Sequence, residues 1–235
     1  MKGHTTGKQK PFIRSFVTRS RRLTLAQQRG WDVGFPKWGL TTTSGTLDWD
    51  AVFGFQGRRV LEIGFGMGDS LLQMARAEPD AQFVGVEIHR PGVGKLVNQV
   101  DSTGLVNLRV YSEDAVNVFE RSLESESLDA IHIYFPDPWP KKRHHKRRLI
   151  QAPLVSLLAD KLRVNGVIHL ATDWDPYAEH MFAVLEAEPR LANLAGPGRF
   201  SPRPKFRPQT KFELRGERLG HSVRDIIYQR QIDSH

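Results

Sequence analysis

The stretch Arg59-Val-Leu-Glu-Ile-Gly-Phe-Gly-Met-Gly68 decides the fold of this chain. Its first half is apolar and β-branched, which predicts a short buried strand over residues 59–63. Its second half has glycine at every other position and leads into a helix predicted over residues 69–77. Glycine lets a backbone turn tightly and approach a bound molecule closely. The stretch therefore predicts a strand–turn–helix unit whose turn binds a ligand, with a tight turn that binds nothing as the alternative.

The alternation of strands and helices continues along the chain. Strands are predicted over residues 82–88, 105–111, 128–135 and 166–171, and helices over about residues 93–102, 114–123, 152–163 and 176–188. Such an alternation predicts a mostly parallel sheet with helices on both faces. Thr210-Lys-Phe-Glu213 is typical of a capping box that begins a helix. A last strand over residues 221–230 breaks the rhythm, and we expect it to run antiparallel.

The spacing of the glycines indicates which ligand the turn binds. Gly64, Gly66 and Gly68 form the pattern G-x-G-x-G, whereas the dinucleotide fingerprint needs its third glycine at the position of Asp69. This departure disfavours NAD and an oxidoreductase. It favours the version of the fold that binds S-adenosylmethionine (SAM).

Three acids lie where open α/β sheets bind ligands, at strand ends or in the first strand–helix turn. Glu62 directly precedes the glycines. Glu87 ends the second strand, where an acid accepts hydrogen bonds from the ribose hydroxyls of an adenosine ligand. Asp114 follows the third strand, where a side chain meets the adenine edge, although an acid at a helix start is also a good cap.

A second stretch, Phe135-Pro-Asp-Pro-Trp-Pro-Lys-Lys-Arg-His-His-Lys-Arg-Arg148, follows the fourth strand. Proline fixes φ and biases the residue before it away from helix, so the first half is predicted to be a stiff loop. The loop carries Asp137 and Trp139 at the sheet edge, and six Lys/Arg follow Pro140. This arrangement is suited to holding a base next to a phosphate backbone. An ordinary turn followed by a solvated basic face is the alternative.

The net charge of +8 comes from the N-terminal segment. Residues 1–31 contain eight Lys/Arg and no Asp or Glu, which leaves 26 basic against 26 acidic residues in the remaining chain. Such a distribution favours nucleic acid over an anionic membrane, because the segment lacks an apolar helical face. We predict a basic, partly flexible arm over residues 1–45 and one α/β domain over residues 46–235. Two roles are open for the aromatic residues of the arm, stacking on bases or pinning the arm to the domain surface, and pinning is expected for most of Phe12, Phe16, Trp31 and Trp38.

The composition excludes several kinds of site. Without cysteine there is no disulfide, thiol nucleophile or Cys-based zinc site. His144 and His145 lack further ligands at metal spacing, so no metal is expected, and the strand residues His132 and His169 are expected to be hydrogen-bonded structural residues. No run approaches the about 18 apolar residues of a membrane span, and no secretory signal is visible. We expect a cytoplasmic protein, monomeric or homodimeric, that does not bind a membrane.

Five segments together resemble the bacterial tRNA (guanine-N7-)-methyltransferases, the TrmB family. They are Glu62-Ile-Gly-Phe-Gly-Met-Gly68, Gly85-Val-Glu-Ile-His89, Phe135-Pro-Asp-Pro-Trp-Pro-Lys-Lys142, Thr172-Asp-Trp174 and Thr210-Lys-Phe-Glu213; Arg14-Ser-Phe-Val-Thr-Arg19 is similar too. The resemblance covers nearly the entire chain. It implies a Rossmann-like class I methyltransferase with a mostly parallel seven-stranded sheet, which transfers the methyl group of SAM to N7 of a guanine in the tRNA variable loop.

The resemblance also implies roles for individual residues, which complete those that the glycine turn and the basic run indicate. The predicted SAM pocket consists of Glu62, Gly64, Gly66, Gly68, Glu87, Asp114 and Asp137. The predicted substrate contacts are Lys141, Asp173, Thr210, Lys211, Phe212 and Glu213. Basic residues expected to contact the RNA are Lys142, Arg143, Lys146, Arg147 and Arg148.

The chemistry of guanine N7 fits these residues, with Asp137 as the catalytic residue. N7 has a lone pair and no proton to lose, so its methylation needs no general base. Alignment of the base helps, as does a carboxylate near a ring that becomes positively charged. Asp137 is predicted to supply both by accepting hydrogen bonds from guanine N1–H and N2–H₂, an edge that adenine lacks. Two other functions stay open: a SAM-dependent methyltransferase for a different RNA, a protein or a small molecule, and a non-catalytic RNA-binding protein.

Overall fold

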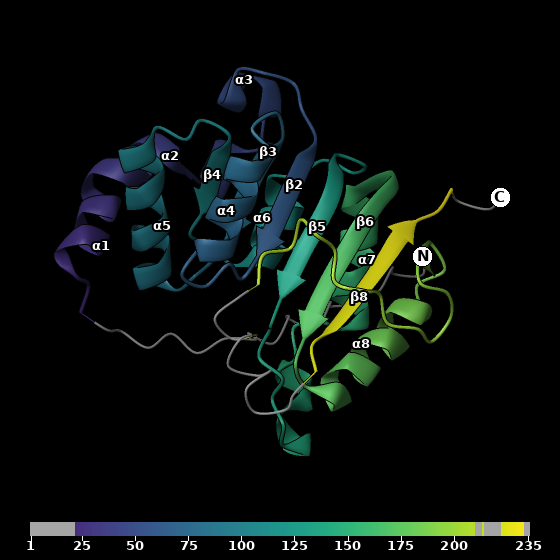
Figure 1. Ribbon diagram of the computed structural model, residues 1–235. Coiled ribbons are helices and arrows are strands. Elements are labelled where there is room, and N and C mark those ends of the chain that lie inside the picture. The colour runs from purple at the N-terminus through teal and green to yellow at the C-terminus, as the bar shows by residue number, and fades with distance from the viewer. Residues whose placement is uncertain (1–21, 210–212, 214–221, 233–235) are drawn as a thin grey trace, which may run out of the picture.

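The computed structural model describes residues 22–209, 213 and 222–232, which build one eight-stranded sheet in the order β1-β4-β3-β2-β5-β6-β8-β7 (Figure 1). The strands are β1 Gly39–Leu40, β2 Arg59–Ile63, β3 Gln82–Val86, β4 Leu108–Tyr111, β5 Leu128–Tyr134, β6 Leu162–Thr172, β7 Leu191–Asn193 and β8 Arg224–Arg230. All pairings from β1 to β6 are parallel, and β8 is antiparallel to both β6 and β7. The predicted parallel fold and its antiparallel C-terminal strand are confirmed.

The sheet has eight strands, whereas the resemblance implied seven and the sequence pattern located six. The strands without a counterpart in the sequence pattern, β1 and β7, have two and three residues and lie at the two edges of the sheet. Runs this short show no periodicity, and only pairing with a neighbouring strand defines them. A predicted strand is also longer than expected. β6 begins at Leu162 rather than near residue 166, because the preceding helix ends at Lys161 and no loop separates the two elements.

The helices that link these strands follow the predicted order. They are α1 Leu25–Arg29, α2 Phe35–Trp38, α3 Trp49–Phe53, α4 Asp69–Ala77, α5 Arg90–Thr103, α6 Ala115–Arg121, α7 Ala152–Lys161 and α8 Asp175–Glu186, with a π-helical turn η1 Gly30–Gly34 and 3₁₀ turns η2 Thr42–Ser44 and η3 Lys142–Arg147. The prediction for α4 is confirmed residue for residue. Of the helices in the described ranges, none has the length and apolar character to cross a membrane.

The two faces of the sheet are covered differently. One face packs against helices, with side chains of α3, α6, α7 and α8 in a single apolar cluster. On the other face α4 and α5 cover β2, β3 and β4. Beyond them an irregular segment, residues 201–209, crosses in front of β5, β6 and β8 (Figure 1). This second cover lies beside the carboxyl-terminal edge of the parallel strands.

Part of the predicted arm is built into the fold. Residues 1–21 lie outside the described residues, but α1, η1 and α2 pack on α5. A Cβ on Gly30 would lie 1.8 Å from the carbonyl oxygen of Gly94, so the two helices approach to backbone contact. Trp31 donates from Nε1 to the Arg90 carbonyl at 3.0 Å, and Trp38 donates to Asp101 at 3.2 Å. The predicted pinning is confirmed for these two rings.

Candidate active site

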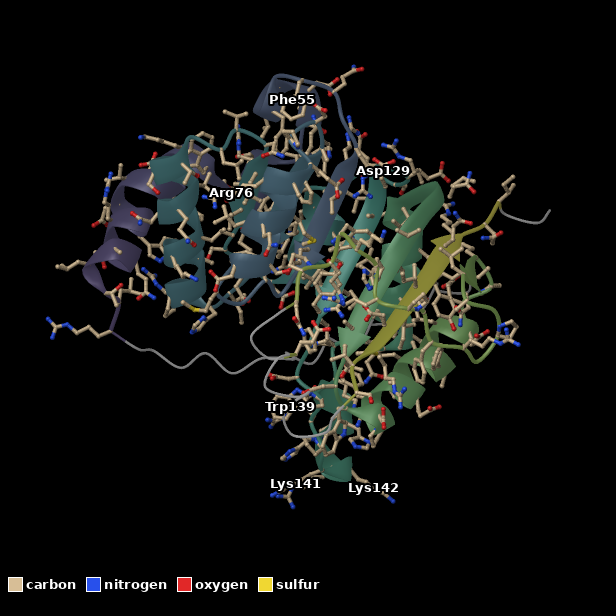
Figure 2. All side chains as sticks on the ribbon, in the orientation of Figure 1. Phe55, Arg76, Asp129, Trp139, Lys141 and Lys142 are labelled. Carbon is tan, nitrogen blue, oxygen red and sulfur yellow. The ribbon has the colours of Figure 1, made fainter. Side chains whose placement is uncertain are left out.

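A pocket of about 210 Å³ lies at the carboxyl-terminal edge of the parallel strands. The residues that line it mostly end or follow β2, β3 and β5: Ile63, Gly64, Glu87, Tyr134, Phe135, Pro136, Asp137, Trp139 and Leu149. Figure 2 shows Trp139, Lys141 and Lys142 at this end of the molecule and Phe55 and Asp129 at the opposite end. The fold therefore brings the glycine turn and the Asp137 loop together.

The glycine turn has a backbone that glycine adopts readily and other residues do not. The φ angles of Gly64, Gly66 and Gly68 are 75°, 57° and 78°, all in the left-handed region. A Cβ on Gly64 or Gly66 would meet no atom within 4 Å, whereas one on Gly68 would lie 2.8 Å from Cβ of Leu96. The first two glycines leave open space over the turn, and the third lets the turn pack on α5.

Glu87 ties the end of β3 to this turn. Its Oε2 accepts a hydrogen bond from the Gly66 amide at 2.8 Å, and its Oε1 accepts from the amides of Ile88 and His89 at 2.7 and 2.9 Å. The carboxylate is half-buried and forms part of the pocket wall. It is thus fixed by backbone donors while still facing the pocket.

Glu62, the last acid of β2, is only 2% exposed. Its Oε2 has no hydrogen-bond partner among the described residues. Burial raises the pKa of Glu62 to about 8, and the nearby negative charge of Glu87 adds to the shift. The side chain is therefore mostly protonated at neutral pH, until a cation or a hydrogen-bond donor approaches it.

The loop that carries Asp137 has a strained backbone. Phe135 and Trp139 have φ angles of 52° and 43°, which are rare for aromatic residues and cluster at functional sites. The Phe135 amide donates to the Ala171 carbonyl at 2.8 Å and holds the start of the loop on β6. Asp137 is exposed, yet the pocket walls desolvate its carboxyl group and raise its pKa above the usual range. The loop thus presents Asp137 between two fixed rings.

The basic run after the loop folds into η3, and its cations differ in exposure and in their partners. The guanidinium of Arg147 lies over the Trp139 ring, 5.1 Å from the centroid. Arg148 departs from the prediction of an RNA contact, because it is 4% exposed and donates from Nε to the Pro138 carbonyl at 2.9 Å. Arg148 therefore supports the Asp137 loop from inside. The exposed members of the run are Lys141, Lys142, Arg143 and Lys146.

The remaining predicted site residues lie outside the pocket wall. Asp114 caps α6 by accepting a hydrogen bond from the Val116 amide at 2.9 Å, so its adenine contact stays a prediction. Asp173 directly follows β6 at the same sheet edge and is half-buried. Glu213 is 2% exposed. It is also helical, whereas Thr210, Lys211, Phe212 and the rest of the helix predicted to begin there lie outside the described residues.

Sequence reasoning missed a buried polar cluster beside the pocket. Tyr134, a pocket residue, shares a hydrogen bond with His169, which contacts Asp225, which in turn binds Arg207. The structural role predicted for His169 is confirmed. His132 differs from its prediction, since both its ring nitrogens are buried without a partner in the described ranges. One signal was available: the strand histidines share a sheet face with Glu62, because all three stand at paired register positions.

Comparison with known proteins identifies the family. Residues 56–226 match the family described as "Putative methyltransferase". A tRNA (guanine-N(7)-)-methyltransferase of Alcanivorax borkumensis is 51% identical over 226 residues, which cover 96% of this chain and 95% of the relative. A protein of the same name from Pseudomonas paraeruginosa is 55% identical over 218 residues, covering 93% of this chain and 89% of the relative. The chain belongs to the bacterial tRNA (guanine-N(7)-)-methyltransferase family. The predicted resemblance is confirmed.

Solved structures agree with a methyltransferase fold. The 16S rRNA methyltransferase KamB superposes with a TM-score of 0.56 at 15% identity, covering 80% of this chain and 95% of that one. The aminoglycoside resistance methyltransferase NpmB1 superposes with a TM-score of 0.55 at 15% identity, covering 82% and 95%. Both likenesses concern the fold alone. They confirm the class I methyltransferase architecture that the resemblance implied. SAM is the cofactor of this methyltransferase family member.

Proposed function

We propose that the protein transfers the methyl group of SAM to N7 of a guanine in the variable loop of tRNA and forms 7-methylguanosine. The observation that carries this proposal is the position of Asp137. It lies in one pocket with Glu87 and the glycine turn, and the exposed cations of η3 follow it along the chain. A carboxylate thus stands between a nucleoside-type site and a basic surface. Membership of the family supports the substrate.

The residues of the pocket fit SAM. SAM supplies a methyl group on a positively charged sulfur. The open space above Gly64 and Gly66 leaves room for a ligand against the backbone, and Glu87 suits ribose hydroxyls. The unpaired Oε2 of Glu62 is a buried acceptor at the same strand ends, which suits a positively charged donor. Asp114 and Asp137 complete the proposed set.

Asp137 acts in this proposal by positioning the base rather than by removing a proton. Guanine N7 attacks with its lone pair, so the pocket needs no general base. The Asp137 carboxylate accepts hydrogen bonds from guanine N1–H and N2–H₂ and offsets the positive charge that develops on the ring. Adenine presents an acceptor at N1, so the same carboxylate repels it. The rings of Tyr134 and Phe135 wall the pocket and limit access of water.

The basic surface holds the RNA in this proposal. Reaching N7 inside a folded tRNA requires the base to leave its tertiary contacts, which costs a few kcal/mol. Contacts from exposed cations to phosphates offset that cost. We assign this role to Lys141, Lys142, Arg143 and Lys146, with Arg147 held on the Trp139 ring beside the pocket. Asp173 and the Thr210–Glu213 motif are assigned to substrate contact.

The test is incubation of the purified protein with labelled SAM and bulk tRNA, followed by cleavage at 7-methylguanine. We expect label in tRNA and one cleavage site in the variable loop. Label that survives RNase would instead indicate a protein substrate, and cleavage elsewhere or in another RNA would indicate a different RNA substrate. Absence of SAM binding by calorimetry would point to a non-catalytic RNA-binding protein.

A further inference from the structure

A buried arginine, Arg207, joins the polar cluster to the Thr210–Glu213 motif. Its side chain is 0% exposed. It donates from Nε to Asp225 Oδ1 at 2.7 Å and from Nη2 to Asp225 Oδ2 at 2.9 Å. It also donates from Nη1 and Nη2 to the two carboxylate oxygens of Glu213, both at 2.8 Å. One guanidinium thus holds a residue of β8 and the one motif residue that the structure describes.

The same guanidinium touches the wall of the pocket. Its carbon lies 5.9 Å from the ring centroids of both Tyr134 and Phe135, and both residues line the pocket. Tyr134 Oη and His169 Nδ1 are 3.0 Å apart, and His169 Nε2 lies 2.7 Å from Asp225 Oδ1. Because a carboxylate only accepts, His169 carries its proton on Nε2 and accepts from Tyr134 at Nδ1. Hydrogen bonds therefore run without a gap from Tyr134 to Arg207.

Arg207 also fixes a segment that has no helix of its own. Residues 201–209 cross β5, β6 and β8 as irregular chain (Figure 1), paired to β8 at the bridge between Ser201 and Asp225. The Phe206 ring stacks on His132 at 5.8 Å. Two buried carboxylates share the single guanidinium, and only its planar fork donates to both at once. A lysine at this position would leave one carboxylate without its pair of bonds.

We propose that Arg207 is a positioning residue for the methyl-transfer reaction. It holds Glu213, the described residue of the Thr210–Glu213 motif, in a fixed place relative to Tyr134 and Phe135. The inference rests on the proposed function, since it concerns the substrate motif of the same site. Arg207 acts through Glu213 and the pocket rings.

The test compares Arg207→Lys and Glu213→Gln with a matched control, Arg230→Lys. Arg230 is likewise a buried arginine. It lies at the end of β8 that is remote from Asp225, and it pairs with Glu126. In Arg207→Lys and Glu213→Gln we expect kcat at saturating SAM and tRNA to fall by about 10- to 100-fold, because small displacements cost that much. The dissociation constant for SAM, measured by calorimetry, should change less than about threefold. The double variant should lose no more activity than the worse single one.

Hydrogen exchange of the amides of residues 201–209, measured without tRNA, gives a second readout. We expect it to accelerate in Arg207→Lys and not in the control. If Arg207→Lys does not fold, the exchange of residues 201–209 in Glu213→Gln decides, because the loss of a substrate contact alone leaves that exchange unchanged without tRNA. A kcat no lower than that of Arg230→Lys, or unchanged exchange, overturns the proposal. A third outcome is that exchange accelerates in Arg207→Lys while the wild-type protein makes no 7-methylguanosine. It would overturn the proposed function and the link to methyl transfer, but not the role of Arg207 in holding Asp225 and Glu213 together.

Discussion

The pocket and the cluster around Arg207 lie side by side on the same sheet, yet their polar side chains differ in how completely they are paired. In the cluster, the buried charges of Arg207, Asp225 and Glu213 are paired at 2.7 to 2.9 Å. Glu62 directly precedes the pocket residues Ile63 and Gly64, and its buried Oε2 has no partner among the described residues. Asp137 in the pocket wall is exposed on a strained loop.

This difference in pairing distinguishes polar groups that can bind a ligand from polar groups that stabilise the fold. An unpaired buried oxygen costs free energy that a ligand with a hydrogen-bond donor recovers. Buried charges that are paired with one another, such as Arg207 and Asp225, instead fix the geometry of the segments that carry them. Tyr134 belongs to both regions, because its ring lines the pocket and its hydroxyl group joins the cluster.

The largest expected effect concerns Glu62 and pH. The folded pKa of about 8 lies above the ordinary value of 4.5. Between these values the folded protein binds a proton that the unfolded chain has lost, so stability is lost as pH rises through this window. The loss is on the order of 5 kcal/mol by linkage. Glu62→Gln should remove it, as urea unfolding of both proteins across this pH range without SAM would reveal. Parallel pH profiles would contradict the view that Glu62 awaits a partner.

A smaller effect is expected at the glycine turn. Gly68→Ala places a Cβ in the left-handed region and against Leu96, so we expect a loss of stability of about 2 to 4 kcal/mol. Gly64→Ala has the same backbone strain but open space, and should cost about 1 to 2 kcal/mol. Chemical denaturation measures both. Equal losses would mean that the open space over Gly64 does not exist. SAM affinity should fall in Gly64→Ala, because the new Cβ fills the space for the ligand.

The smallest effect is expected on the basic surface. Lys142 is exposed at the pocket end of the molecule (Figure 2), so Lys142→Ala should leave stability within about 0.5 kcal/mol of wild type. Binding of tRNA should weaken a few-fold, and the slope of log K against log salt should decrease by about 1. Arg76→Ala removes an exposed cation from α4 and is the matched control. Equal salt slopes in the two variants would show that Lys142 does not contact RNA phosphates.

The sequence predicted those parts of the molecule that local chemistry determines. Alternating glycines after a β-branched run gave β2, the turn and α4, and prolines around Asp137 gave a stiff loop at the sheet edge. The positions of the acids Glu62, Glu87 and Asp137 followed from the strand ends, and the structure brings the last two into one pocket.

What the sequence could not predict depends on contacts between distant segments. Nothing in the run from Lys141 to Arg148 marks its last arginine as the one that turns inward, because that depends on an acceptor at Pro138. Arg207 follows two cations that are exposed, Arg203 and Lys205. Its own burial depends on Glu213 and on Asp225, 18 residues further on. The edge strands β1 and β7 exist through pairing alone.

The central claim is that the Asp137 carboxylate positions guanine for methyl transfer, and single-turnover kinetics test it most directly. The rate is measured at saturating SAM and tRNA for wild type, Asp137→Ala and the control Asp80→Ala, whose exposed carboxylate precedes β3 at the opposite edge of the sheet. We predict a loss of about 100- to 1,000-fold for Asp137→Ala and none for the control. A rate for Asp137→Ala near that of wild type would contradict the account.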